Sequence, residues 1–70
     1  MVTGAQIRMA RAGLRLSVRD LAALAKVSPN TVTRVEGGGA ANSSTLAALR
    51  RALEDAGVEF DGENGVRLKD

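Results

Sequence analysis

The chain has 70 residues, of which 44% are hydrophobic, and carries ten basic and eight acidic side chains for a net charge of +2. Seventy residues are enough for one domain and too few for two. The sequence has no Cys and no His, which excludes disulfides, Cys/His zinc sites, thiol nucleophiles and histidine bases, so we expect no enzyme, no metal and no cofactor.

The first element is predicted to be a helix that runs from Thr3 or Gly4 to Ala12. Ile7, Ala10 and Leu14 fall on one helical face, at spacings of i, i+3 and i+7. Thr3 can cap this helix, and the glycine at position 13 is expected to end it.

A second helix is predicted from Ser17 to about Lys26. The run 17–20, Ser-Val-Arg-Asp, has the form of a capping box, with an acid three residues after the hydroxyl. We expect its buried stripe to consist of Leu21, Leu24 and Ala25.

A third helix follows at once, with Ser28 as its cap and Pro29 in its first turn. Val32 and Val35 are spaced to face inward, and the glycines at 37–39 end the helix. Because β-branched residues give this short helix little intrinsic propensity, it must depend on tertiary packing.

The fourth helix has the strongest periodicity, since Leu46, Leu49 and Leu53 repeat at i, i+3 and i+7 among several alanines. One of the polar residues 42–44 caps it. Gly57 is the natural residue just past its end.

After Gly57 the apolar period changes from 3.6 to 2, which predicts a β-hairpin over 58–70. A three-residue loop, Glu63-Asn64-Gly65 with a left-handed glycine, opposes Phe60 to Leu68. This register also opposes Asp61 to Arg67 and Glu59 to Lys69. We prefer it to a two-residue Asn-Gly turn, which opposes Phe60 to Lys69. A two-stranded hairpin is marginal alone, so it must rest on the fourth helix or pair with a partner.

Residues 17–36 form a unit of two short capped helices separated by a tight break at 25–27. The small side chain of Ala22 lets the two helix backbones approach closely. This is the helix-turn-helix arrangement, whose second helix enters the major groove of DNA while the first crosses the backbone. Charge agrees with this interpretation: residues 1–53 carry a net charge of +6 and residues 54–70 carry −4, so the first part can meet a polyanion and the tail should point elsewhere.

The run LSVRDLAALAKVSPNTVTRVEGG, residues 16–38, resembles the XRE family of lambda-repressor-like helix-turn-helix regulators. Arg11 matches a family arginine that typically forms an ion pair with a glutamate at the position of Glu36. The tail, over 52–60 and 65–68, resembles that of short alphaproteobacterial members. The resemblance implies a mainly α fold, a four-helix lambda-repressor-like bundle over 1–57 with a short C-terminal β-hairpin extension over 58–70.

The resemblance also implies a sequence-specific DNA-binding transcriptional regulator. We expect this regulator to act as a homodimer that places helix 28–36 in the major groove of double-stranded DNA, on an operator with two half-sites. The family's base-reading positions fall on Pro29, Asn30, Thr33 and Arg34. Asn can bond adenine, Arg can bond guanine and Thr can contact a thymine methyl group. We expect phosphate contacts from the groups near two helix N-termini, namely Arg15, Ser17, Arg19, Ser28 and Thr31.

Two departures from the family pattern remove phosphate contacts. Val18 stands where the family usually has Gln, and the loop at 37–42 has no charge. A monomer should therefore bind DNA weakly, and we expect the hairpin to contribute to dimerisation through Val58, Phe60, Val66 and Leu68. The same departures leave an alternative open: an antitoxin-like or anti-activator module that binds a regulatory protein partner through its acidic hairpin.

No stretch approaches the ~20 apolar residues of a membrane span, and the first residues lack the apolar segment of a secretory signal. We therefore expect no membrane contact and a cytoplasmic protein, associated with the nucleoid through DNA.

Overall fold

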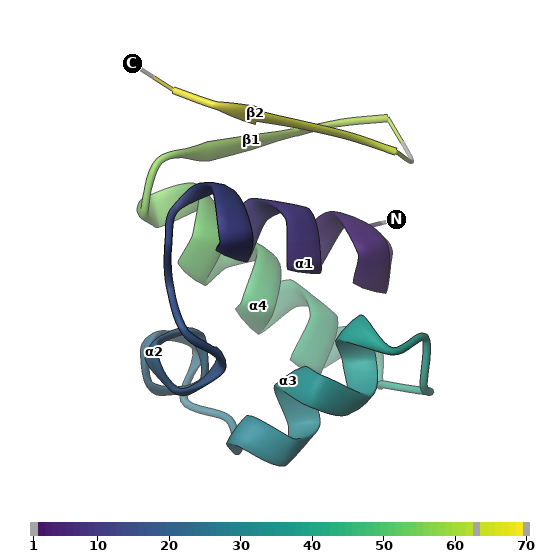
Figure 1. Cartoon of the computed structure of the whole chain (residues 1–70). Helices are drawn as coiled ribbons and strands as arrows, with labels where there is room; N and C mark the ends of the chain where they lie inside the picture. The colour runs from purple at the N-terminus through teal and green to yellow at the C-terminus, as the bar shows by residue number, and fades with distance from the viewer. Residues whose placement is uncertain (1, 63, 70) are drawn as a thin grey trace.

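A computed structural model describes residues 2–62 and 64–69 of the chain. Four helices are followed by two antiparallel strands, in the order α1 (Gly4–Gly13), α2 (Val18–Ala25), α3 (Pro29–Glu36), α4 (Ser43–Asp55), β1 (Val58–Asp61) and β2 (Gly65–Leu68). The hairpin lies at one end of the bundle and α3 at the opposite end (Figure 1). The mainly helical fold with a C-terminal hairpin is the one the sequence predicts.

Each helix begins where a polar side chain caps it. Thr3, Ser17, Ser28 and Asn42 each accept a hydrogen bond from a backbone N–H in the first turn of the helix that follows. This satisfies one of the N–H groups that a helix start leaves without a partner. The predicted helix starts are confirmed.

The end of α1 differs from the prediction. Gly13 lies within the helix, and the residue in the left-handed conformation is Arg15, at φ 59°. The N–H of Leu16 donates to the carbonyl of Arg11 at 3.0 Å, and that of Arg15 to Ala12 at 3.0 Å. This is the Schellman arrangement, which needs a left-handed residue two positions beyond Gly13.

The core is built from all four helices and β1. Its largest fully buried apolar side chains are Ile7, Leu21, Val32, Leu49, Leu53 and Val58. Leu24, which we predicted to be buried, is 54% exposed. The buried face of α2 is centred between Leu21, Ala22 and Ala25, and Leu24 lies about 100° around the helix from that centre.

The hairpin forms, but its register is two residues away from the predicted one. Phe60 pairs with Val66, Glu59 with Arg67, and Val58 with Leu68. Gly62 takes the positive φ, at 64°, and the connection spans 62–64, of which Glu63 lies outside the described residues. A shift of two residues leaves every side chain on its predicted face.

Gly65 is needed for a different reason from the one we predicted. It pairs with Asp61, and a Cβ at position 65 would lie 2.5 Å from the carbonyl oxygen of Asp61. The glycine therefore allows a close approach of the two strands.

The hairpin packs on the bundle. Val58 is completely buried in the core, and the side chain of Leu68 lies against Gly13. The prediction that Val58 contacts a partner therefore needs correction, because its side chain serves the core of its own chain. Within the described residues, no helix has the length and apolar content needed to cross a bilayer.

Candidate nucleic-acid interface

The turn between α2 and α3 sets the geometry of the candidate interface. Lys26 adopts the left-handed conformation, at φ 59°. The N–H of Val27 donates to the carbonyl of Ala22 at 3.0 Å, which closes α2, and Ser28 then caps α3. Only residues 26–28 separate the two helices, so their relative orientation is fixed by a few backbone hydrogen bonds.

The outer face of α3 carries the four side chains that we predicted to read bases. Pro29, Asn30, Thr33 and Arg34 are exposed, while Val32 and Val35 on the opposite face are buried. At 100° per residue, the four exposed side chains fall on one continuous face of the helix. The structure therefore brings all four predicted base-reading residues together on one surface.

The start of α3 presents hydroxyl groups to solvent. The hydroxyl of Ser28 accepts the N–H of Thr31 at 3.1 Å, and the two side-chain oxygens lie 2.8 Å apart. One hydroxyl proton is used between them, so the other remains to donate to an anion. A helix N-terminus that also carries a donor hydroxyl suits a phosphate group.

The start of α2 is less favourable for phosphate than the sequence suggested. The hydroxyl of Ser17 accepts the N–H of Asp20, and the carboxylate of Asp20 accepts the N–H of Ser17, both at 3.0 Å. The backbone hydrogen bond from Ser17 lowers the pKa of Asp20, so a negative charge is held at this helix start. Phosphate binding here must therefore rely on Arg15 and Arg19, which are exposed.

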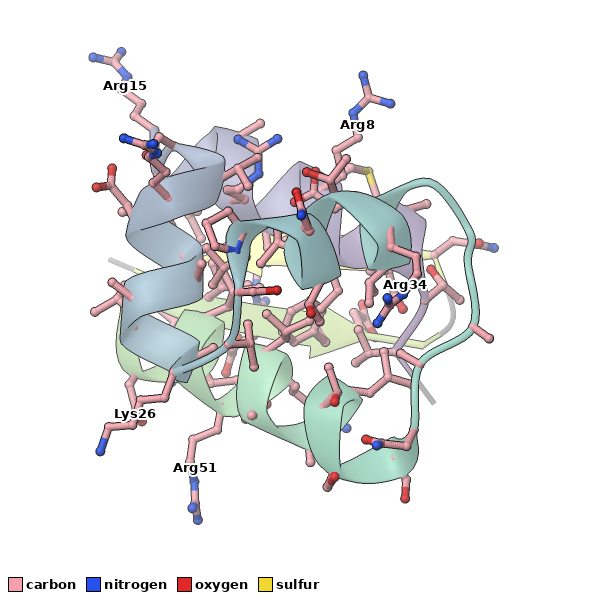
Figure 2. All side chains as sticks on the ribbon, turned by 90° about the horizontal axis from the view of Figure 1, so that it is seen from below. Arg8, Arg15, Lys26, Arg34 and Arg51 are labelled. Carbon is pink, nitrogen blue, oxygen red and sulfur yellow. The ribbon has the colours of Figure 1, made fainter. Side chains whose placement is uncertain are left out.

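Several cations surround α2 and α3. Figure 2 shows Arg8, Arg15 and Lys26 extending away from the body of the molecule. Among residues 2–62 and 64–69, the ion pairs engage Arg11, Arg50 and Arg67. Arg8, Arg15 and Lys26 are not among them and are available to a polyanion. The acidic hairpin lies at the far end of the bundle (Figure 1), as the charge asymmetry of the sequence predicts.

A shallow hollow of about 290 Å³ lies between α1, α2 and α3. Its lining includes Arg8 from α1 and Thr33 from the exposed face of α3. Arg11 also borders this hollow, but its guanidinium is bonded to Glu36. The hollow thus places one uncommitted arginine of α1 beside a predicted base-reading residue.

The comparison with known families decides what this arrangement is. A family model described as a helix-turn-helix domain matches residues 3–61. The chain belongs to this family. It is a helix-turn-helix domain of the XRE, lambda-repressor-like type. A search among curated proteins finds no match.

The helix-turn-helix match covers all four helices and β1, and ends at Asp61, before β2 begins. DNA binding is the general role of such a domain. The second strand of the hairpin therefore lies outside the segment that the family model matches.

From the sequence, Arg8 and Lys26 are weaker candidates for phosphate contacts than Arg15 and Arg19. In the structure both are exposed basic residues close to the two helices of the motif. The position of Arg8 depends on how α1 packs against α3, and that of Lys26 depends on its left-handed backbone conformation. Tertiary packing has no local sequence signal, and the left-handed conformation is normally signalled by glycine, which is absent at position 26.

Proposed function

We propose that this chain is a sequence-specific DNA-binding transcriptional regulator. It acts as a homodimer on an operator with two half-sites and inserts α3 into the major groove at each. The outer face of α3 carries this proposal. Asn30, Thr33 and Arg34 expose there the groups that bond adenine, contact thymine methyl and bond guanine. The buried valines on the other face hold the helix to the bundle.

Phosphate contacts position the helix in this proposal. Ser28 and Thr31 lie at the start of α3, and Arg15, Arg19 and Lys26 supply charge at both ends of α2. Each phosphate that such a group neutralises steepens the fall of affinity with salt. We therefore expect binding that weakens strongly between about 50 and 200 mM salt.

Selection from random DNA tests the proposal. The wild-type chain should enrich one sequence motif with two related halves, centred about one helical turn apart. Arg34→Ala should lose discrimination at one base pair of each half, at a cost of roughly 1–3 kcal/mol. Enrichment of no motif, together with stoichiometric recovery of a protein partner, would instead support the protein-interaction alternative.

The second subunit is proposed to meet this one at the β2 edge of the hairpin. The N–H of Lys69 donates to the carbonyl of Gly57 at 2.7 Å. Because bonded and non-bonded pairs alternate along antiparallel strands, Val66 and Leu68 direct their backbone N–H and C=O groups away from β1. The β2 edge thus offers backbone groups to which a second strand can bond.

Exposed apolar side chains lie beside this edge. Leu68 is 49% exposed and packs against Gly13 of α1, and Met9 of the same helix is 46% exposed. Ala5 and Ala12, which share the outer side of α1 with Met9, are also exposed. A twofold contact that pairs two β2 strands brings these small and apolar side chains of both copies together.

The β1 edge is the alternative site for a second copy. It borders a hollow of about 520 Å³ whose lining includes Glu54, Glu59 and Asp61 together with Arg67 and Lys69. Antiparallel pairing of two β1 strands places like acidic charges opposite each other, and pairing of two β2 strands does the same with basic charges. Charge therefore does not distinguish the two edges, and the choice of β2 rests on the exposed apolar side chains beside it.

The oligomeric state tests this part of the proposal. Leu68→Glu should reduce the solution mass to that of one chain and weaken operator binding. Ala47→Glu, which introduces the same charged residue at an exposed position of α4, should leave both unchanged. Deletion of the hairpin is unsuitable because it removes Val58 from the core. An unchanged mass for Leu68→Glu would exclude the β2 edge.

A further inference from the structure

The loop after α3 folds back onto the helix that it follows. Gly38 takes the left-handed conformation, at φ 87°. The N–H of Gly39 donates to the carbonyl of Arg34 at 2.8 Å, and that of Gly38 donates to Val35 at 3.0 Å. These two bonds form a Schellman motif, and they place the backbone of Gly39 directly against Arg34.

The approach of Gly39 to Arg34 leaves no room for a side chain on the glycine. A Cβ at position 39 would lie 2.6 Å from Cγ of Arg34 and 2.9 Å from its carbonyl oxygen. Both distances are far inside van der Waals contact. The aliphatic stem of Arg34 therefore lies in space that only a glycine at position 39 provides.

The three consecutive glycines differ in what a side chain would meet at each position. A Cβ at Gly37 would meet nothing closer than the carbonyl of Thr33 at 3.4 Å, and Gly37 has a negative φ. Gly38 has open space around it but a left-handed φ. Of the three, Gly39 is the one whose added Cβ would collide with a side chain of the exposed face of α3.

We propose that Gly39 is a positioning residue for Arg34. Its bare backbone holds the stem of Arg34 against the α3–α4 loop and thereby directs the guanidinium along the C-terminal part of the α3 face. Figure 2 shows Arg34 beside this loop, whereas Arg8, Arg15 and Lys26 extend outward. The inference rests on the proposed function, in which Arg34 bonds one base pair.

Positioning matters for an arginine that reads a base. The guanidinium bonds guanine through two parallel N–H groups, so both its place and its plane must be correct. A flexible side chain loses rotamer freedom when it binds, and a stem already held in place loses less. Gly39 thus supports discrimination at one base pair without touching DNA.

The experiment compares Gly39→Ala with Gly37→Ala, the same substitution two residues earlier, where the added Cβ makes only ordinary van der Waals contact. The readout is affinity for the selected operator and for its single-base variants. Arg34→Ala should lose about 5- to 150-fold in discrimination at one base pair. Gly39→Ala should lose several-fold at the same base pair and little elsewhere, while Gly37→Ala should match the wild type.

A double variant separates positioning from a general effect on the fold. In the Arg34→Ala background, Gly39→Ala should cause no further loss of discrimination, because the group it misplaces is gone. A loss that persists in that background, or a Gly39→Ala variant that behaves like Gly37→Ala, overturns the inference. If Arg34→Ala itself keeps full discrimination, Arg34 does not read a base and that part of the proposed function fails. NMR relaxation of the free chain then tests separately whether Gly39 holds the Arg34 side chain in place.

NMR relaxation of the wild-type chain tests the positioning of Arg34 without any variant, and it also serves if Gly39→Ala does not fold. NMR relaxation of the arginine side chains in the free wild-type chain should show Arg34 more ordered than Arg8, which extends from α1 (Figure 2). Equal mobility of the two side chains overturns the inference without any variant.

Discussion

Arg11 of α1 and Glu36 at the end of α3 are joined by a bidentate ion pair. Nε of Arg11 lies 2.7 Å from Oε2 of Glu36, and Nη2 lies 3.0 Å from Oε1. The remaining nitrogen, Nη1, donates to the carbonyl of Leu16 at 3.0 Å. The hydrogen bond to Glu36 raises the pKa of the Arg11 guanidinium. One side chain thus joins α1, the turn before α2 and the helix that we propose enters DNA.

Glu36→Gln should lower the free energy of unfolding by more than the loss of an exposed ion pair does. The side chain of Glu36 is only 9% exposed, so the change leaves a largely buried arginine without its counter-charge. We expect the free energy of unfolding in urea to fall by about 1–3 kcal/mol, between the values typical of surface and buried pairs.

Glu54→Gln is the matched control for this change. Glu54 pairs with Arg50 at 3.0 Å on the exposed surface of α4, at i and i+4, where such a pair contributes about 0.3–0.5 kcal/mol. Equal losses for the two variants would contradict the idea that the Arg11–Glu36 pair holds α1 to α3.

Lys26→Gly should raise stability and weaken DNA binding at the same time. Lys26 has φ 59°, a conformation that glycine adopts without a Cβ penalty, so we expect a gain of about 0.5–1 kcal/mol in the free energy of unfolding. The loss of one phosphate contact should reduce the slope of log affinity against log salt by about one.

Lys26→Ala separates the two effects, because alanine removes the charge but keeps the Cβ. It should weaken DNA binding as much as Lys26→Gly and give no gain in stability. Unchanged salt dependence in both variants would remove Lys26 from the interface and leave its left-handed conformation without a functional reason.

The helices were predictable because their signals are local. Ser17, Ser28 and the apolar spacing of α4 act within one or two turns, and all three predictions are confirmed. The exposure of Leu24 was not predictable in this way, since it depends on how α2 is rotated against its neighbours. The family resemblance, rather than periodicity, supplied the four exposed residues of α3.

The hairpin register and its attachment depend on contacts across the whole chain. Gln6 illustrates this best. Its side chain is fully buried, and Nε2 donates to the carbonyls of Gly62 and Gly65, both at 3.0 Å. A glutamine in the first turn of α1 carries no sequence signal for a contact with residues 56 and 59 positions later. Conversely, the shape of the turn is fixed partly by α1.

Gln6→Met should loosen the hairpin selectively. Methionine fills a similar volume but removes the side-chain donor to the partly buried carbonyls of Gly62 and Gly65, at an expected cost of about 1–3 kcal/mol. Amide exchange should accelerate most in β1 and β2, while the core amides of α2 and α3 respond only to the loss of overall stability. Operator binding by α3 should be retained if the dimer persists.

Thr3→Ala provides the control for Gln6→Met. It removes the hydroxyl that accepts the Gln6 N–H at 3.2 Å and so weakens the cap of α1, by about 1 kcal/mol, without removing the donor to the hairpin. Exchange in β1 and β2 that responds equally to the two variants would show that Gln6 acts through the helix cap alone.

The stability of the folded domain should fall at low pH as the carboxylates of Asp20 and Glu59 gain protons. The backbone hydrogen bond from Ser17 lowers the pKa of Asp20, and the hydrogen bond from Arg67 lowers that of Glu59. A pKa lowered by folding stabilises the folded chain above the unfolded pKa of about 4, and this contribution is lost as pH falls through the folded pKa. The melting temperature should therefore hold from pH 7 to about 5 and decline below about 4 as each carboxylate gains its proton.

Asp20→Asn should make that decline shallower, because the charge at the start of α2 is then absent at every pH. At pH 7 the same variant should melt at a lower temperature than the wild type, and near pH 3 the two should converge. Asp55→Asn is the control: this exposed acid ends α4, where a negative charge opposes the helix dipole, so its removal should not lower the melting temperature at pH 7. A constant difference between Asp20→Asn and the wild type across the whole range would show that the Ser17–Asp20 capping box stabilises α2 through its hydrogen bonds alone and not through charge.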